Sequence, residues 1–318
     1  MAATEVAVRA QELGYRSYWT AEANGPESFA VLAAAGAAAP GLDLGTGIVP
    51  IQVRSPLLAA MGAATLQALH PGRRVLLGVG ISSPVITGRW HGVPYGEHPL
   101  SQMREYVDVL RALLASEAVT HDGPTYQLKG AQLGVRLGEQ RPLVVLAALN
   151  PGMLRLAGEV ADGVLLNYLP SSYVGASVAS VREGEAAAGR APGSCRVFAY
   201  VHVGVAERGE EARDRARRDV WSYAVADGYA RMFRKAGYAA EIDALRAARD
   251  AGDRKGQVAA ISDRMCDDID FVGPAEEVAA FVQAYADAGV DEPVVMPLPW
   301  GPDRMKVIQD TIAAVASS

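Results

Sequence analysis

The sequence predicts an α/β protein, a (β/α)8 TIM barrel, and two observations lead to this prediction. Short apolar runs rich in Val, Leu and Ile alternate along the 318-residue chain with segments of helical periodicity. Such runs, bounded by glycine or proline, are typical of strands buried on both faces of a parallel sheet. Strict alternation of strand and helix allows a closed barrel or an open, doubly wound sheet. Because no Gly-x-Gly-x-x-Gly turn follows an early strand, the open sheet is kept only as the alternative.

Seven of the apolar runs are expected to be strands, and they begin at Ser17, Leu42, Arg74, Leu143, Gly163, Arg196 and Glu292. Helical patterns lie between them, among them "SFAVLAAAGAAA", "PLLAAMGAATLQAL", "MREYVDVLRALLA" and "PAEEVAAFVQAYADAG". An amphipathic helix, "MAATEVAVRAQELG", precedes the first run. Seven strands are one short of an eightfold barrel, so we expect the first strand to be absent from this sequence.

Two segments interrupt the alternation. In the first, residues 119–134, Asp-Gly lies between short alternating runs, which predicts a hairpin decorating a loop. In the second, residues 208–265, the pattern is almost wholly helical, and its charged run "ERGEEARDRARRD" is interpreted as a solvated helix face. This insertion follows the seventh strand of the barrel, so we expect a lid over the C-terminal mouth, where barrel enzymes keep their active sites. Residues 1–318 are predicted to form one domain.

Composition excludes several classes of protein. A net charge of -6 gives no long-range attraction for nucleic acid or an anionic membrane. No apolar run reaches the roughly 18 to 20 residues that span a bilayer, and the N-terminus lacks the pattern of a signal peptide. Two cysteines form no disulfide framework. We therefore expect a cytoplasmic protein, without a metal site, because no His or Cys spacing suits a ligand set.

The stretch from Ala147 to Asn167 predicts a strand, helix, strand unit. Asn150 is a favoured N-cap, and Pro151 suits the first helical position because its missing N–H would have no intrahelical partner there. Gly163 can take the left-handed conformation that ends the helix. The free backbone N–H groups at the start of the helix form a place where a phosphate or another anion can bind.

Several ordered motifs resemble the bacterial luciferase-like monooxygenase superfamily, most closely its branch that uses the deazaflavin coenzyme F-420. They are "LGTGIVPIQVRSPLLAAMGAATLQAL", "GRRVLLGVG", "RWHGVPY", "MREYVDVLRALLASEAVTHDGPTY", the stretch from Ala147, and "AISDRMCDDIDFVGPAEEVAAFVQAYADAGVDEPVVMP". The similarity runs from about Gly14 to about Pro297. It implies a barrel whose C-terminal mouth receives the flavin or deazaflavin ring.

The resemblance also implies where the coenzyme binds. A bulge with a non-proline cis peptide in the third strand supports the ring in the family, and it maps onto Gly47, Ile48 and Val49. The segment after the fourth strand lines the pocket and maps onto Gly80, Ile81, Ser82 and Ser83. The turn after the fifth strand holds the phosphodiester of the tail and maps onto Ala148, Leu149, Asn150, Pro151, Gly152 and Met153.

The sequence departs from the sugar-phosphate dehydrogenases of the branch. Where these have an Asp-His pair and a later Glu, this chain has Glu22, Ala23 and Ser83, so we do not expect sugar-phosphate oxidation. Glu22 and Asn24 lie just beyond the second strand, where catalytic groups of barrels project. Glu22 is a candidate catalytic residue, or else a carboxylate that caps the helix near Ser28. His91 is a candidate proton donor, or else it packs the long loop with Trp90.

Three further residues are candidates for the substrate pocket. Asn167 and Tyr168 follow the sixth strand, and His202 alternates with Tyr200 on the seventh, where a core role for the histidine is the alternative. Arg54, Arg89 and Arg155 are candidates for the anionic tail of the coenzyme, because arginine pairs well with carboxylates and phosphates.

The leading hypothesis is an F-420-dependent oxidoreductase that transfers a hydride between the coenzyme and an unidentified small organic substrate. Because the deazaflavin has carbon in place of the flavin N5, it exchanges a hydride rather than activating oxygen. An FMN-dependent monooxygenase of the same superfamily is one alternative, and a non-catalytic flavin- or deazaflavin-binding protein is another. The Ala-rich helices and the resemblance predict a homodimer.

Overall fold

The computed structural model describes residues 2–115 and 118–316, and the chain folds as two compact units. Unit 1 contains the residues up to Ala148 together with 152–165 and 181–196. Unit 2 contains 149–151, 166–180 and the chain from Val197 onward. The chain therefore passes between the units near the start of one helix, at the end of one strand, within a second helix and at the start of a long strand.

The first part of unit 1 alternates helices with short strands. Its elements are α1 (Ala2–Glu12), β1 (Ser17–Thr20), α2 (Ser28–Ala38), β2 (Asp43–Thr46), β3 (Val49–Pro50), α3 (Pro56–Leu69), β4 (Val75–Gly80), the π-helical turn η1 (Val85–Trp90) and α4 (Pro99–Leu114). Strands β2 and β4 contain β-branched residues and glycine, and every residue of these two strands is buried. Ser55 caps α3 by accepting a hydrogen bond from the Leu58 N–H, and Pro56 takes the first helical position.

The remaining elements complete the alternation. They are β5 (Val119–Asp122), β6 (Gln127–Ala131), β7 (Leu143–Ala147), α5 (Pro151–Val160), β8 (Gly163–Leu166) and α6 (Ser171–Ala187). Within unit 1 the strands pair in the order β1, β2, β4, β7, β8, and every pairing is parallel. In the described residues β1 has β2 as its one strand neighbour. The described strands therefore do not close a barrel at β1.

Small residues set the spacing of helices in unit 1. Ala7 and Ala10 of α1 pack on Ala35 and Ala39 of α2 and on Leu42. Helices α5 and α6 approach still more closely: a Cβ on Gly158 would lie 2.1 Å from the Val181 carbonyl oxygen, and a Cβ on Gly184 would lie 2.0 Å from that of Arg155. Only glycine fits at these two positions, because backbone atoms occupy the space of a side chain.

Strands β5 and β6 form an antiparallel pair, and the Glu105 carboxylate of α4 makes several of the hydrogen bonds that attach it. Glu105 is 9% exposed and accepts hydrogen bonds from the Thr125 N–H, from the Tyr126 N–H at 2.8 Å, and from His121 Nε2 at 3.0 Å. Burial alone would raise the pKa of Glu105, but these hydrogen bonds outweigh it and lower the pKa below its ordinary value. The glutamate thus binds the decorating hairpin to the body of unit 1.

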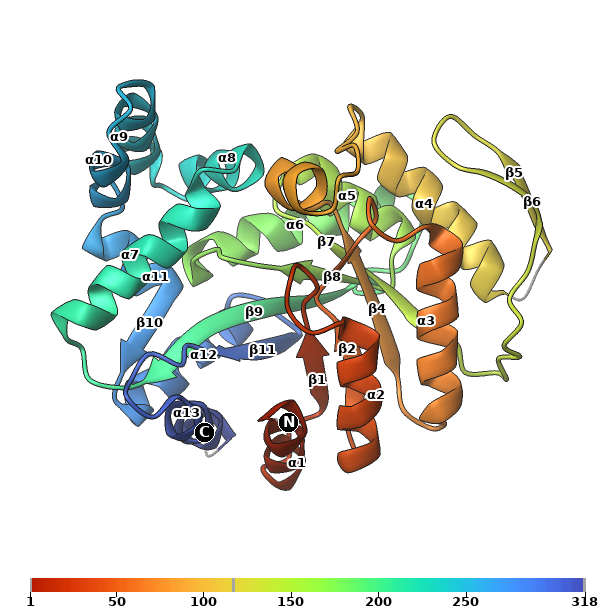
Figure 1. Ribbon diagram of the computed structural model, residues 1–318, viewed down its shortest axis with the longest axis horizontal. Helices are drawn as coiled ribbons and strands as arrows, with labels where there is room; N and C mark the ends of the chain where they lie inside the picture. Colours follow the sequence, from red (N-terminus) through yellow and green to blue (C-terminus); the bar gives the residue numbers. More distant parts are fainter. Residues whose placement is uncertain (1, 116–117, 317–318) are drawn as a thin grey trace. The chain divides into compact units, whose positions relative to one another are not determined.

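Unit 2 is built on β9 (Arg196–Val205), which pairs in parallel with β10 (Asp270–Gly273) and with β11 (Glu292–Pro297). Its helices are α7 (Glu210–Ala224), α8 (Asp227–Lys235), α9 (Ala239–Asp250), α10 (Arg254–Ala259), α11 (Asp263–Ile269), α12 (Ala275–Asp287) and α13 (Arg304–Ala316). Figure 1 shows α7 to α11 as the teal-to-blue group of helices between β9 and β10 in the chain.

The structure confirms the predicted strands and corrects two expectations. Each of the seven predicted strands is present, and the run from Leu42 is divided into β2 and β3. Strand β10 was missed because its four residues follow α11 without a turn signal. The left-handed conformation expected of Gly163 was wrong: this glycine begins β8 and is not among the residues with positive φ.

Candidate active site

The segment between β2 and β3 is a bulge with an unusual peptide bond. The bond between Gly47 and Ile48 is cis, which confirms the conformation that the family resemblance predicted there. The Gly47 N–H donates to the Thr20 carbonyl oxygen at 2.7 Å, and the Glu22 N–H donates to the Ile48 carbonyl oxygen at 3.2 Å. The end of β1 therefore holds the bulge on both sides of the cis bond.

Two glycines of β4 make room for this bulge. A Cβ on Gly78 would lie 1.9 Å from the Thr46 carbonyl oxygen, and a Cβ on Gly80 would lie 2.8 Å from Ile48 Cγ1. The hydroxyl of Thr46 donates to the Gly78 carbonyl oxygen at 2.8 Å. Strands β3 and β4 pair Pro50 with Gly80. The bulge at residues 47–49, which is predicted to support the ring, therefore lies beside the start of the predicted pocket segment at residues 80–83.

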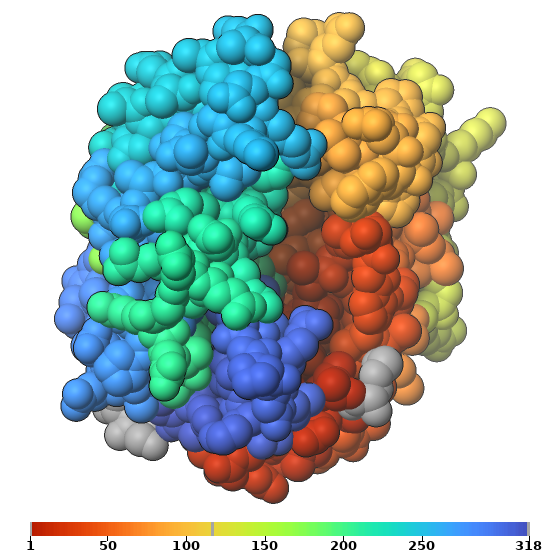
Figure 2. Space-filling view, turned by 60° about the vertical axis from the view of Figure 1, so that its left-hand side comes forward, coloured from red at the N-terminus to blue at the C-terminus, as the bar shows by residue number. Residues whose placement is uncertain are grey.

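The segment after β4 is fixed by local hydrogen bonds. The Ser82 N–H donates to Gln52 Oε1 at 3.4 Å, while Ser83 accepts from the Ile86 N–H through its hydroxyl and from the Thr87 N–H through its carbonyl. Ile81, Ser82 and Ser83 are half-buried. Ser83 is thus occupied in starting η1, the exposed segment that forms the orange surface in Figure 2.

The turn after β7 lies at the same edge of the sheet. Strands β4 and β7 are parallel neighbours with Val79 opposite Leu146, so their carboxyl ends meet. Helix α5 begins at Pro151, as predicted. Asn150 directs its side-chain amide to the Gly228 carbonyl oxygen at 2.9 Å, within unit 2. The cap predicted for Asn150 stays a prediction.

The candidate catalytic residue Glu22 is bound to an arginine. Arg54 donates to both carboxylate oxygens of Glu22, at 2.8 and 2.9 Å, and it also pairs with Glu27. The Arg54 guanidinium lies over the Phe29 ring at 5.0 Å from its centroid, a cation–π arrangement. The alternative role predicted for Glu22 was wrong, because Glu27 caps α2 by accepting from the Ala30 N–H at 2.7 Å.

The other two catalytic candidates, Asn24 and His91, are exposed at the surface of unit 1. His91 is exposed, and its Nε2 lies 3.0 Å from the Ala23 carbonyl oxygen, the residue between Glu22 and Asn24. Asn24 is exposed in the loop after β1. The structure therefore places His91, which follows η1, against the loop that carries Glu22 and Asn24, and of these three residues only Glu22 is shielded from water.

The three substrate candidates come together inside unit 2. His202 Nε2 lies 2.9 Å from Asn167 Oδ1, and the Asn167 amide donates to the Tyr229 hydroxyl at 3.0 Å. His202 is only 5% exposed, and burial lowers its pKa to about 3, so the imidazole is neutral at ordinary pH. A neutral imidazole that meets a carbonyl oxygen at Nε2 carries its proton on that nitrogen, which leaves Nδ1 as an acceptor.

Tyr168 has a backbone conformation that needs support from its surroundings. Its φ is 50°, in the left-handed region that bulky residues rarely adopt. The ring stacks on Tyr223 with centroids 3.8 Å apart and lies 3.9 Å from the His202 ring, and its hydroxyl donates to Asp219 Oδ2 at 2.7 Å. These contacts hold a buried tyrosine in place directly beside His202.

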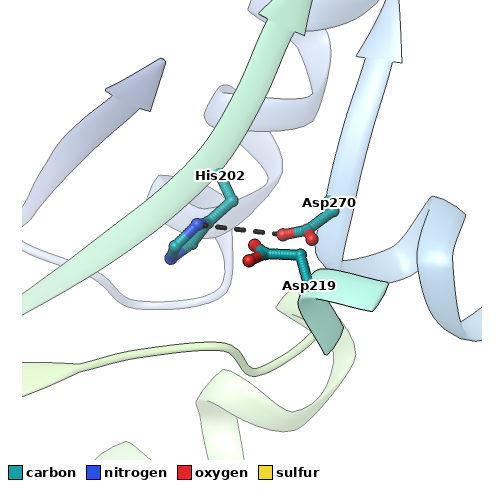
Figure 3. Close-up of side chains that lie close together, drawn as sticks. All are labelled: His202, Asp219 and Asp270. Atoms are coloured by element: carbon teal, nitrogen blue, oxygen red, sulfur yellow. Dashed lines mark ion pairs between the residues drawn. The ribbon is translucent and has the colours of Figure 1, made fainter. Parts of the chain in front are cut away.

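Two acidic residues beside His202 were missed by the sequence reasoning. Asp219 of α7 and Asp270 of β10 direct their carboxyl groups toward the imidazole (Figure 3), with His202 Nδ1 at 3.8 Å from Asp270 Oδ1. Asp219 is the last residue of the run interpreted as a solvated face, so that interpretation was wrong at this position: Asp219 is half-buried. Register explains the meeting, because Asp270 and His202 are paired on adjacent parallel strands.

Asp270 is a carboxyl group without a donor. It is 3% exposed, and neither of its oxygens accepts a hydrogen bond from any residue that the structure describes. Burial, followed by the neighbouring Asp219 carboxyl group, raises the pKa of Asp270 well above its ordinary value. The cluster His202, Asp219 and Asp270 is also a group of three potential metal ligands, each offering an atom within 4.8 Å of the others.

The predicted arginines have different surroundings. Arg54 is occupied by Glu22 and Glu27, and Arg155 pairs with Glu183 at 2.8 Å on the surface of unit 1. Arg89 is exposed on η1. Two of the three guanidinium groups proposed for an anionic tail are thus already paired with carboxylates.

Comparison with known proteins identifies the family. The sequence profile described as Luciferase-like monooxygenase matches residues 2–292. The chain belongs to this family. It is 32% identical over 275 residues to the 5,10-methylenetetrahydromethanopterin reductase of Archaeoglobus fulgidus, covering 84% of this chain and 80% of the relative. It is 29% identical to a protein of Mycobacterium tuberculosis provisionally assigned as a coenzyme F-420-dependent oxidoreductase, covering 92% of this chain and 89% of the relative.

A solved structure confirms the fold class. The coenzyme F-420-dependent tetrahydromethanopterin reductase of Methanopyrus kandleri superposes with a TM-score of 0.81 at 23% identity, over 99% of this chain and 93% of that chain. The predicted luciferase-like, TIM-barrel type of fold is therefore correct, and the chain is an enzyme of an oxidoreductase family. In the part of the chain that the structure describes, the helices are too short or too polar for any of them to cross a bilayer.

Proposed function

We propose that the chain is an F-420-dependent oxidoreductase that transfers a hydride between the deazaflavin and a small organic substrate. The observation that carries the proposal is the match of residues 2–292 to the luciferase-like monooxygenase family, supported by a curated relative whose name assigns it as a coenzyme F-420-dependent oxidoreductase and by the close packing of Gly78 and Gly80 against Thr46 and Ile48. When bound, the deazaflavin supplies a carbon that gives or accepts the hydride.

The residues of unit 1 fit such a group. Gly78 and Gly80 let the bulge at Gly47, Ile48 and Val49 pack directly against β4, and the bulge would support the flat ring. The residues from Gly80 to Ser83 would line one side of the ring. The free N–H groups of Gly152 and Met153, in the first turn of α5, would hold the phosphodiester of the tail, because a helix N-terminus favours negative charge.

The roles of the candidate polar residues follow from their contacts. Glu22 and Arg54 would shape the entrance beside the bulge, since the Glu22 N–H holds the Ile48 carbonyl and its carboxylate is fixed by Arg54. Asn24, in the loop after β1, and His91, after η1, are candidates for contact with the substrate. Asn167 and Tyr168 would bound the substrate in unit 2, while the buried His202 positions Asn167.

A binding titration tests the proposal. We expect F-420 to quench the tryptophan fluorescence of the purified protein with saturation, and FMN to quench it far less. Gly80→Ala places a Cβ against Ile48 and should weaken F-420 binding by about tenfold, the equivalent of roughly 1.4 kcal/mol. Gly175→Ala, on an open face of α6, is the matched control and should bind normally. Tight binding of FMN without binding of F-420 would favour a monooxygenase and overturn the proposal.

A further inference from the structure

The cluster of His202, Asp219 and Asp270 has the chemistry of a cation site. It combines one imidazole nitrogen with two carboxylates, drawn from β9, α7 and β10, all within unit 2. A mixed set of one nitrogen and two oxygen ligands suits Zn²⁺ and similar transition-metal dications better than Mg²⁺ or Ca²⁺, which prefer oxygen ligands alone.

Asp270 supplies an observation that points to a missing partner. A buried carboxyl group ordinarily takes part in hydrogen bonds, because leaving its oxygens unpartnered in the protein interior costs free energy. Asp270 is 3% exposed, its oxygens have no donor among the described residues, and it is directed at His202 and Asp219. A cation shared by the three side chains would supply the partner that the described residues do not provide.

The atoms around the cluster match the surroundings of known metal ligands. A histidine that binds metal through one ring nitrogen usually donates the other N–H to a carbonyl or carboxylate oxygen. His202 does this toward Asn167 Oδ1 at 2.9 Å, which directs the lone pair of Nδ1 toward Asp270. A ligating carboxylate is commonly hydrogen bonded as well, and Asp219 accepts from the Tyr168 hydroxyl at 2.7 Å.

We propose that His202 Nδ1, Asp219 and Asp270 bind one divalent transition-metal ion, with Zn²⁺ as its representative. The ion links α7, the first helix of the inserted segment, to strands β9 and β10. It serves to fix α7, and with it Tyr168, rather than to take part in hydride transfer. The charge balances, since two carboxylates and a neutral imidazole together offset the two positive charges of the ion.

The test uses the full-length protein. The protein is stripped with EDTA and dialysed, and ZnCl₂ is then titrated by calorimetry while thermal unfolding is followed with and without the metal. We expect one Zn²⁺ per chain and a higher Tm with the metal. Asp270→Asn and Asp219→Asn should each weaken Zn²⁺ binding by at least about tenfold and remove most of the Tm shift.

Asp268→Asn is the matched control, because Asp268 lies in the same segment and accepts from the Tyr238 hydroxyl at 2.8 Å, outside the cluster. It should bind Zn²⁺ normally. Should Asp270→Asn fail to fold, the half-buried Asp219→Asn variant and the visible spectrum of Co²⁺ bound to the unmutated protein still decide the matter. Absence of stoichiometric binding by the unmutated protein, or normal binding by both cluster variants, would overturn the proposal.

Discussion

Glu105 in unit 1 and Asp270 in unit 2 are both removed from water by folding, yet their surroundings are opposite. Glu105 accepts hydrogen bonds from two backbone N–H groups and from His121, and its pKa is lowered. Asp270 has no donor among the described residues, and its pKa is raised. The difference separates a carboxylate whose hydrogen bonds stabilise the fold from a buried carboxyl group that has no hydrogen-bond donor among the described residues.

The largest loss of stability is expected at Glu105, because this carboxylate has the larger number of hydrogen-bond donors. Glu105→Ala leaves the N–H groups of Thr125 and Tyr126 without an acceptor, so we expect the free energy of unfolding to fall by about 2 to 4 kcal/mol. Denaturant unfolding measures the change, and hydrogen exchange should show that the β5 and β6 pair opens first. Glu139→Ala, at an exposed position, is the control. A loss equal to that of the control would show that the Glu105 contacts do not stabilise the fold.

The pH dependence of this contact gives a second, smaller effect. The folded pKa of Glu105 lies below its ordinary value of 4.5, so the folded protein holds fewer protons on this group than the unfolded chain. The resulting stabilisation is complete above the unfolded pKa and is lost as the pH falls through the lower folded pKa. The stability difference between the unmutated protein and Glu105→Gln should therefore shrink in acid. A difference that grows as the pH falls would contradict the assignment.

In unit 2, Asp219 differs from Asp270 because it does accept a hydrogen bond, which the Tyr168 hydroxyl donates. Tyr168→Phe removes the 2.7 Å hydrogen bond to Asp219 and should cost about 1 to 2 kcal/mol. Tyr173→Phe, on α6, should change stability by less than the error of thermal unfolding. Equal stability of the Tyr168→Phe variant and the unmutated protein would mean that Asp219 does not depend on this donor.

The smallest effect is expected at Asp270 itself. In protein stripped with EDTA, Asp270→Asn replaces an uncompensated buried carboxyl group with a neutral amide of the same shape, so stability should change by less than about 1 kcal/mol in either direction. Glu105→Gln should be clearly destabilising under the same conditions. A loss of several kcal/mol at Asp270 would show that a donor from the chain does compensate it, and the contrast with Glu105 would disappear.

The strands and the bulge at Gly47 and Ile48 could be predicted from the sequence because their signals are local. Apolar runs bounded by glycine or proline mark the strands, and the ordered motifs of the family locate the bulge at Gly47 and Ile48. Strand β10 was out of reach because only its register against His202 reveals it. The cluster of Asp219 and Asp270 could not be predicted for a related reason. Asp219 ends a highly charged run, and Asp270 begins a strand of four residues, so neither sequence pattern indicates a buried carboxyl group.

The roles of single polar residues were predicted less well than the backbone. Glu22 stays a candidate, and its bidentate contact with Arg54 could not be predicted because the arginine is 32 positions away in the sequence. The grouping of Asn167, Tyr168 and His202 at one edge follows from parallel strands and was predictable. The burial of these three residues could not be predicted, because it depends on Tyr223 and Tyr229 of the inserted helices.

The central claim is hydride transfer by a deazaflavin, and a turnover assay under exclusion of oxygen tests it most directly. Purified protein is mixed anaerobically with reduced F-420 and a panel of enones, imines and nitro compounds, and with oxidised F-420 and a panel of alcohols, while the visible absorbance of the coenzyme is followed. We expect at least one substrate to be converted without oxygen and with F-420 alone. Turnover that requires both FMN and oxygen would contradict the claim.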